Sequence, residues 1–164
     1  MSYKLNAFAA VGIVMLVGGQ AFSQGVVAQR NLSLAMAKAI AEGTIAECKA
    51  KGFNTAAAVV DRAGQVLVIM RDEQSAPHIT EMARRKAYTA RVFRMTTNDF
   101  QKRTQTDPTY TAQRDIADVL ALGGGVPIQI GNETIGGVGS AGSTQEQDES
   151  CSKAGIAKVA ELLK

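Results

Sequence analysis

The sequence contains little that would build a metal centre or an aromatic pocket. It has no tryptophan, one histidine and two cysteines among 164 residues, and its aromatic content is 5%. No Cys-x-x-Cys pair and no cluster of cysteine with histidine occurs, so a zinc site has no support. Lysine and arginine are scattered without a dense run at a formal net charge of +3, which argues against a nucleic-acid partner.

What is present fits one globular domain. Hydrophobic residues make up 46% of the chain, and its three prolines and 16 glycines do not form a low-complexity linker. At this length we expect a single core rather than several domains.

Residues 1–23 have the pattern of a secretory signal peptide. A cation near the N-terminus precedes an apolar run over 7–17, and Ala21-Phe22-Ser23 places small residues at the two positions that signal peptidase reads. We expect cleavage before Gln24, which leaves 24–164 as a single periplasmic or secreted domain. The apolar run is shorter than the roughly 20 residues of a membrane span, so we expect no span in the mature chain. An uncleaved anchor helix is the alternative.

Periodicity and turn residues predict an α+β domain in which an antiparallel sheet is built from two hairpins. The predicted strands are 55–60 with 65–70, and 126–130 with 134–140. The predicted helices are 31–51 (N-cap Asn31 or Ser33), 77–94, one from Thr96 or Thr97 to 104, a helical turn or two in 111–121, and one from the Thr144 capping box to Leu163. The helices between the hairpins form an insertion, and Pro127 places its strand at an edge or at its own start.

The two cysteines lie on the first and last predicted helices. Cys48 is near the end of the first and Cys151 near the start of the last. Antiparallel packing of these helices would bring the thiols close, and export would place them in an oxidising compartment. We predict a Cys48–Cys151 disulfide, with two buried free thiols as the alternative.

The second predicted helix carries a cation on its apolar face. Lys86 falls in the middle of a stripe formed by Ile79, Met82, Ala83, Ala90 and Phe93. Either its stem covers apolar surface while the ammonium reaches water, or the ammonium faces a ligand carboxylate. The only histidine, His78, precedes this stripe, and a lone histidine is more often a surface or capping residue than a ligand.

A glycine-rich segment over 136–142 lies between a strand and the capped last helix. One interpretation is that backbone amides, those of Gly136 and Gly137 among them, bind an anion at the helix N-terminus. The G-x-G-x-x-G spacing and the P-loop lysine are absent, and the other interpretation is that the glycines let the strand approach a neighbour closely. We attribute Asp148 and Glu149, in the first turn of the last helix, to the helix dipole alone.

Seven short motifs follow one another in a specific order. They are Asp61-Arg62-Ala63-Gly64, Arg71-Asp72, Pro77-His78, Arg85-Lys86-Ala87-Tyr88-Thr89-Ala90, Gly123-Gly124-Gly125-Val126-Pro127-Ile128, Ile135-Gly136-Gly137-Val138-Gly139 and Gln147-Asp148-Glu149. Over residues 31–163 this series resembles the GlcG/HbpS-like haem-binding family, which includes the C-terminal domain of PduO-type corrinoid adenosyltransferases. The resemblance implies an antiparallel sheet with its terminal helices packed on one face, and exported members that bind haem and form homo-oligomers.

The resemblance also implies a haem site with an iron donor and cations for the propionates. In this sequence we take His78 as the metal ligand, with Tyr88 and Thr80 as alternatives, and Lys86 and Arg85 as propionate partners. Because no Cys-x-x-Cys-His motif occurs, the haem would be a non-covalent haem b.

Three functions remain open at this point. The first is an exported haem-binding or haem-handling protein, either a carrier or a redox-linked sensor. The second is a binder or enzyme that acts on a small carboxylate metabolite through Lys86 and the glycine-rich segment. The third is an interaction subunit whose apolar surface mainly builds an oligomer. The sequence favours a binding protein over an enzyme.

Overall fold

The computed structural model describes residues 25–164, and the predicted signal peptide lies outside these residues. Four strands form one antiparallel sheet in the order β2-β1-β4-β3. The elements are α1 (Leu34–Ala50), β1 (Ala56–Val60), β2 (Val66–Arg71), α2 (Ile79–Phe93), α3 (Thr97–Thr106), η1 (Pro108–Asp115), β3 (Gly125–Ile130), β4 (Glu133–Ala141), α4 (Gln145–Ala157) and η2 (Ala160–Leu163), where η marks a 3-10 helix. The α+β class and both hairpins are as the sequence predicts.

The first strand of one hairpin and the second strand of the other form the centre of the sheet. Val59 of β1 lies opposite Val68 of β2 on one side and Val138 of β4 on the other. β3 pairs only with β4, so Pro127 lies on an edge strand, as its missing N–H requires. The β1–β2 turn is closed by Asp61, whose Oδ1 accepts hydrogen bonds from the backbone N–H groups of Ala63 and Gln65.

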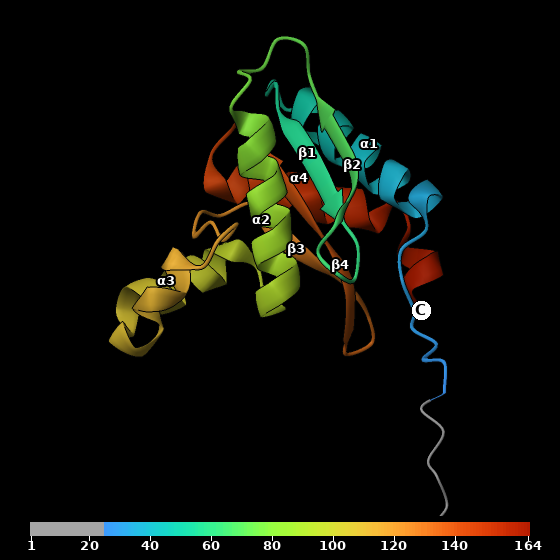
Figure 1. The fold of residues 1–164 in the computed structure, drawn as a ribbon. Helices are drawn as coiled ribbons and strands as arrows, with labels where there is room; N and C mark the ends of the chain where they lie inside the picture. Colours follow the sequence, from blue (N-terminus) through green and yellow to red (C-terminus); the bar gives the residue numbers. More distant parts are fainter. Residues whose placement is uncertain (1–24) are drawn as a thin grey trace, which may run out of the picture.

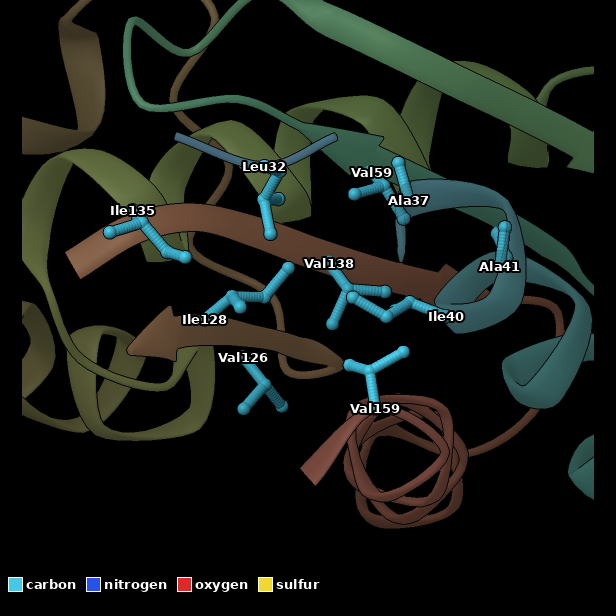
Figure 2. Packing of buried hydrophobic residues seen from close by; sticks show 11 residues of the cluster. Leu32, Ala37, Ile40, Ala41, Val59, Val126, Ile128, Ile135, Val138 and Val159 are labelled. Carbon is cyan, nitrogen blue, oxygen red and sulfur yellow. The ribbon is translucent and has the colours of Figure 1, made fainter. Parts of the chain in front are cut away.

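The terminal helices cover one face of the sheet, as predicted (Figure 1). α1 begins after Ser33, whose hydroxyl accepts from the amide of Met36, and α4 begins after Thr144, whose hydroxyl accepts from the amide of Gln147. Branched aliphatic side chains fill the space between helices and sheet (Figure 2): Leu32, Ile40, Val59, Val126, Ile128, Ile135, Val138 and Val159, with Ala37, Ala41 and Ala57. At the α1–α4 crossing, a Cβ on Gly155 would lie 2.5 Å from the carbonyl oxygen of Ile40, so only glycine permits this approach.

α2 covers the opposite face, across β4, β1 and β3 (Figure 1). The side chains in this second layer are mostly small: Ala56, Ala58, Val60, Ile79, Ala83, Ala87 and Ala141. In β1 the two faces use alternate residues, Ala57 and Val59 on one side and Ala56, Ala58 and Val60 on the other, which is the period of a strand packed on both sides.

Two predicted helical segments differ from the structure. The extra helical turn lies at Pro108–Asp115, earlier than the predicted 111–121, because Asp107 caps the turn by accepting from the amide of Thr109 and Pro108 occupies its first position. The last α-helix ends at Ala157, and only a 3-10 turn follows. None of the helices within residues 25–164 combines the length and the apolar character that a membrane span needs.

Candidate functional site

A buried ion pair lies at the interface of α2, β4 and α4. The Nζ of Lys86 is 2.9 Å from Oδ2 of Asp148 and donates to the carbonyl oxygen of Ser140, also at 2.9 Å. Lys86 and Asp148 are each 1% exposed. The second oxygen of Asp148 accepts from the hydroxyl of Ser143 at 2.7 Å and from its amide at 3.2 Å. Both charges are therefore compensated inside the protein.

This arrangement contradicts the interpretation that the ammonium of Lys86 reaches water. Burial lowers the pKa of Lys86 below its ordinary value, while the charge and the hydrogen bond of Asp148 oppose that shift. A lysine that is already bonded to a carboxylate and a carbonyl has little capacity left for a ligand. The ion pair therefore counts against Lys86 as a propionate or metabolite partner, and we assign it a structural role.

Asp148 is the residue whose role the sequence interpretation missed. Attributing it to the helix dipole alone was wrong, because its side chain points away from solvent and joins α4 to α2 through Lys86. A signal existed: a fully buried lysine is almost always paired, and Asp148 lies in the first turn of the last helix, close after Ser140, Ser143 and Thr144.

The glycines of β4 serve close packing. A Cβ on Gly137 would lie 2.4 Å from the carbonyl oxygen of Ala87, and one on Gly139 would lie 2.2 Å from that of Ala83. A Cβ on Gly136, on the other face, would lie 2.6 Å from the carbonyl oxygen of Val60. These glycines let α2 and the neighbouring strand β1 approach β4 closely, as in the second of the two interpretations given above. The buried strand leaves no open cradle for an anion at Gly136 and Gly137.

His78 lies at the exposed start of α2. It occupies the N-cap position, and its imidazole makes no capping hydrogen bond. Thr80, one of the alternative donors, is half-buried two residues further along. The structure therefore separates His78, on the surface, from Lys86, whose ammonium is directed toward α4.

Tyr88 and Arg85 lie three positions apart on α2 and contact different segments of the chain. The Tyr88 ring packs over the β1–β2 turn, where two of its ring carbons lie 3.0 Å from the position that a Cβ of Gly64 would take. The half-buried guanidinium of Arg85 donates to the carbonyl oxygen of Val119, and its Nε has no partner within the part of the chain that the structure describes. Arg85 therefore has unused donor capacity, unlike Lys86.

The predicted disulfide is present. Cys48 and Cys151 are bonded, with their Cα atoms 5.5 Å apart and both side chains fully buried. The bond joins α1 to α4 near the hydroxyl of Ser140, which is 3.8 Å from the Cys48 sulfur. The disulfide and the Lys86–Asp148 pair therefore meet at the same end of β4, where the Ser140 hydroxyl also donates to Oδ1 of Asp148 at 3.4 Å.

No group of three or more histidine, cysteine, aspartate and glutamate side chains within residues 25–164 is arranged to hold a metal ion. Residues 32–157 match the family model described as haem degrading protein HbpS-like. The chain belongs to the HbpS-like family.

Solved structures of HbpS agree with this membership. A crystal structure of HbpS is 31% identical and covers 82% of this chain and 96% of its own, with a TM-score of 0.77. A double mutant of Streptomyces reticuli HbpS is 29% identical over 91% of this chain and 97% of its own, with a TM-score of 0.76. An uncharacterized 15.0 kDa protein of Citrobacter freundii, from the dhaT-dhaS intergenic region, is 28% identical over 80% of this chain and 94% of its own.

A more distant HbpS-like fold is the crystal structure of a PduOC–haem complex. It is 22% identical over 77% of this chain and 94% of its own, with a TM-score of 0.70. At this identity the likeness establishes a shared fold. The predicted relation to the GlcG/HbpS-like and PduO C-terminal domains is thus confirmed at the level of family and fold.

Proposed function

We propose that this chain is an exported haem-binding or haem-handling protein, a carrier or a redox-linked sensor. The observation that carries the proposal is the match to the HbpS-like family over residues 32–157. HbpS itself is 31% identical with nearly full coverage, and a PduOC–haem complex has the same fold. These similarities support haem binding or handling, while export and the mode of binding are part of our proposal.

His78 is the iron donor that we propose. It is exposed at the start of α2 beside the apolar Ile79 and the half-buried Met82, and its imidazole makes no capping hydrogen bond. Bound haem b, held non-covalently, would supply a redox-active iron with an axial position for such a donor. Thr80 and Tyr88 remain the alternatives.

Arg85 is the propionate partner that we propose, in place of Lys86. Its guanidinium is half-buried and uses one donor group on the carbonyl of Val119. A guanidinium has five N–H donors in a planar fork that matches a carboxylate. Lys86 has no comparable freedom, because its ammonium is held by Asp148 and the carbonyl of Ser140.

Haem titration followed by the Soret band tests the proposal. The parent chain should develop a Soret band that saturates, and His78→Ala should remove or shift it while circular dichroism shows an intact fold. Thr80→Val and Tyr88→Phe are the matched controls, because each removes one of the alternative donors from the same helix. A parent chain without saturable haem binding would refute the function, and an unchanged His78→Ala spectrum would refute the donor.

Export and self-association are further parts of the proposal. Mass spectrometry of protein recovered from outside the cytoplasm should give a chain that begins at Gln24, and an intact Met1 would contradict export. The edge strand β2 exposes Val66 (42%) and Ile69 (40%) beside its unpaired backbone groups, a surface suited to a second copy. Light scattering should therefore report a multiple of the chain mass, and a monomer at micromolar concentration would count against it.

A further inference from the structure

A polar hollow of about 340 Å³ lies at the far end of α2 from His78. Its lining residues come from three segments: the chain before α1, the β1–β2 turn and the last turns of α2. They are Gln29, Asn31, Arg62, Ala63 and Arg91. The hollow is therefore bordered by two guanidinium groups and two amide side chains, with no carboxylate among its lining residues.

Arg62 is already paired within the protein. Its Nη1 forms an ion pair with Glu133, whose carboxylate also binds Arg30. The same nitrogen donates to the carbonyl oxygen of Arg30. Arg62 therefore shapes the hollow but has its carboxylate partner.

Arg91 differs from Arg62 in having no such partner. In residues 25–164 its side chain makes one hydrogen bond, from Nε to the carbonyl oxygen of Arg62, and no ion pair. The carboxylate of the nearby Asp61 closes the β1–β2 turn, where its Oδ1 accepts from the amides of Ala63 and Gln65. Burial and the charges of Arg62 and Arg94 lower the pKa of Arg91, and the charge of Asp61 opposes that shift only in part. Both terminal nitrogens of a half-buried arginine thus remain free to donate.

The amide side chains supply further unused donors. The Oδ1 of Asn31 accepts from the backbone amides of Leu32 and Arg62, which leaves its Nδ2 group as the free end. The side chain of Gln29 is exposed and bonded to nothing else within the described residues. The unsatisfied groups at this hollow are donors, and a ligand that supplies acceptors would complete them.

We propose that this hollow binds a carboxylate group, with Arg91 as the principal donor and the amides of Asn31 and Gln29 as supporting donors. A planar carboxylate accepts two parallel N–H bonds from one guanidinium. One arginine without an ion-pair partner matches the charge of one carboxylate group. The site does not involve Lys86 or the β4 glycines.

Two sources could supply this carboxylate: a haem propionate or a free organic acid. His78 precedes Arg91 by 13 positions, which is about 20 Å along the helix axis. A haem whose iron binds His78 does not reach that far, so the propionate source requires Tyr88 as donor, one turn before Arg91 and packed on the same β1–β2 turn. This source rests on the proposed haem binding, and the free-acid source does not.

The test measures binding of succinate by calorimetry, and of haemin and haemin dimethyl ester by the Soret band. The variant is Arg91→Met, which keeps the stem and removes the charge. Its control is Lys102→Met, which removes one positive charge from an exposed site on α3. Gln29→Glu is a second variant, because it places a repelling carboxylate at the hollow from an exposed position and breaks no internal bond.

We expect both Arg91→Met and Gln29→Glu to weaken carboxylate binding at least tenfold, with Lys102→Met unchanged. Three results together would support the propionate source. Both variants would bind haemin more weakly, the parent would bind the dimethyl ester more weakly than haemin, and Tyr88→Phe would weaken haemin binding. Succinate binding that depends on Arg91 would support the free acid, even if the parent binds no haem. If the parent binds neither probe, or if both variants bind like Lys102→Met, the inference is overturned. Normal haem binding in those variants would leave the proposed function standing.

Discussion

The two faces of the sheet are held by different means. Between the sheet and the terminal helices, branched aliphatic side chains such as Ile40, Ile128 and Val138 interdigitate, and a disulfide joins the two helices. Under α2 the contacts are made by alanines and by the bare backbone of Gly137 and Gly139. The first interface is built from side-chain volume and the second from close approach of the main chains.

The two layers also differ in the kind of link that joins their elements. In the layer of aliphatic side chains, the cross-link between α1 and α4 is the covalent Cys48–Cys151 bond. An interface of small residues leaves room at its margin for a lysine stem, and there the link between elements is the Lys86–Asp148 pair. The two links therefore make different predictions when they are broken.

The largest effect should come from breaking the ion pair on one side. Asp148→Ala leaves the ammonium of Lys86 buried without its carboxylate, and we expect a loss of about 3–5 kcal/mol in the free energy of unfolding. Urea denaturation measures it. The double variant Lys86→Met with Asp148→Leu removes both charges. Its free energy of unfolding should lie within about 1 kcal/mol of the parent value or above it. A single variant as stable as the parent would show that the pair does not hold α2 to α4.

Removing the disulfide should lower the free energy of unfolding slightly less than breaking the ion pair does. Cys48→Ala with Cys151→Ala frees a loop of 103 residues in the unfolded state, and we expect a loss of about 2–5 kcal/mol. The fold should persist, because the aliphatic core between α1, α4 and the sheet remains. Denaturation of the parent with and without reductant provides the control, and reduced parent should match the double variant. Equal stability of oxidised and reduced parent would contradict the prediction.

Adding a methyl group beneath α2 should have a moderate effect. Gly139→Ala places a Cβ 2.2 Å from the carbonyl oxygen of Ala83, so the helix must move away from the strand. We expect a loss of about 1–3 kcal/mol from overpacking. Gly25→Ala, where a Cβ meets nothing within 4 Å, is the matched control and should leave the melting temperature unchanged. If Gly139→Ala and Gly25→Ala have the same melting temperature, the contact between α2 and β4 is looser than the structure indicates.

The smallest effect concerns the loop that leads from β2 toward α2. A hydrogen bond from the backbone of Gln74 and one from Lys49 of α1 hold the pKa of Asp72 below its ordinary value of 3.8. The carboxylate is more acidic in the folded state, so its contribution to stability is complete above that value and is lost as the pH falls through the lower folded pKa. As the pH falls below about 4, Asp72→Asn should show a shallower loss of stability than the parent, while the exposed Asp115→Asn should follow the parent. Parallel curves for all three chains would refute this role.

Much of the fold could be predicted because its signals are local. The N-caps Ser33 and Thr144, the turn at Asp61 and the alternation of the strands each depend on residues within a few positions of one another. The helical turn predicted for 111–121 was misplaced because a stronger local signal, the cap at Asp107 followed by Pro108, lies just before that range.

The site was less predictable. His78 was found as the only histidine, but its exposure and freedom from a capping bond are properties of the folded surface. Arg91 carried no signal in the sequence, because its lack of a carboxylate partner becomes visible only when the β1–β2 turn and the chain before α1 lie beside it. The residues that surround Arg91 are distant from it in the chain, so no local sequence pattern predicts the hollow.

By itself, then, the sequence determined the order of helices and strands, the hairpins, the family and a cysteine pair able to join the first and last helices. Only the tertiary structure decided that Lys86 is internal and bonded to Asp148, 62 residues away, and that the β4 glycines admit a helix rather than an anion. Caps and periodicity follow from hydrogen bonding and burial between near neighbours. The partner of a buried charge and the space above a glycine follow from which elements the sheet brings together.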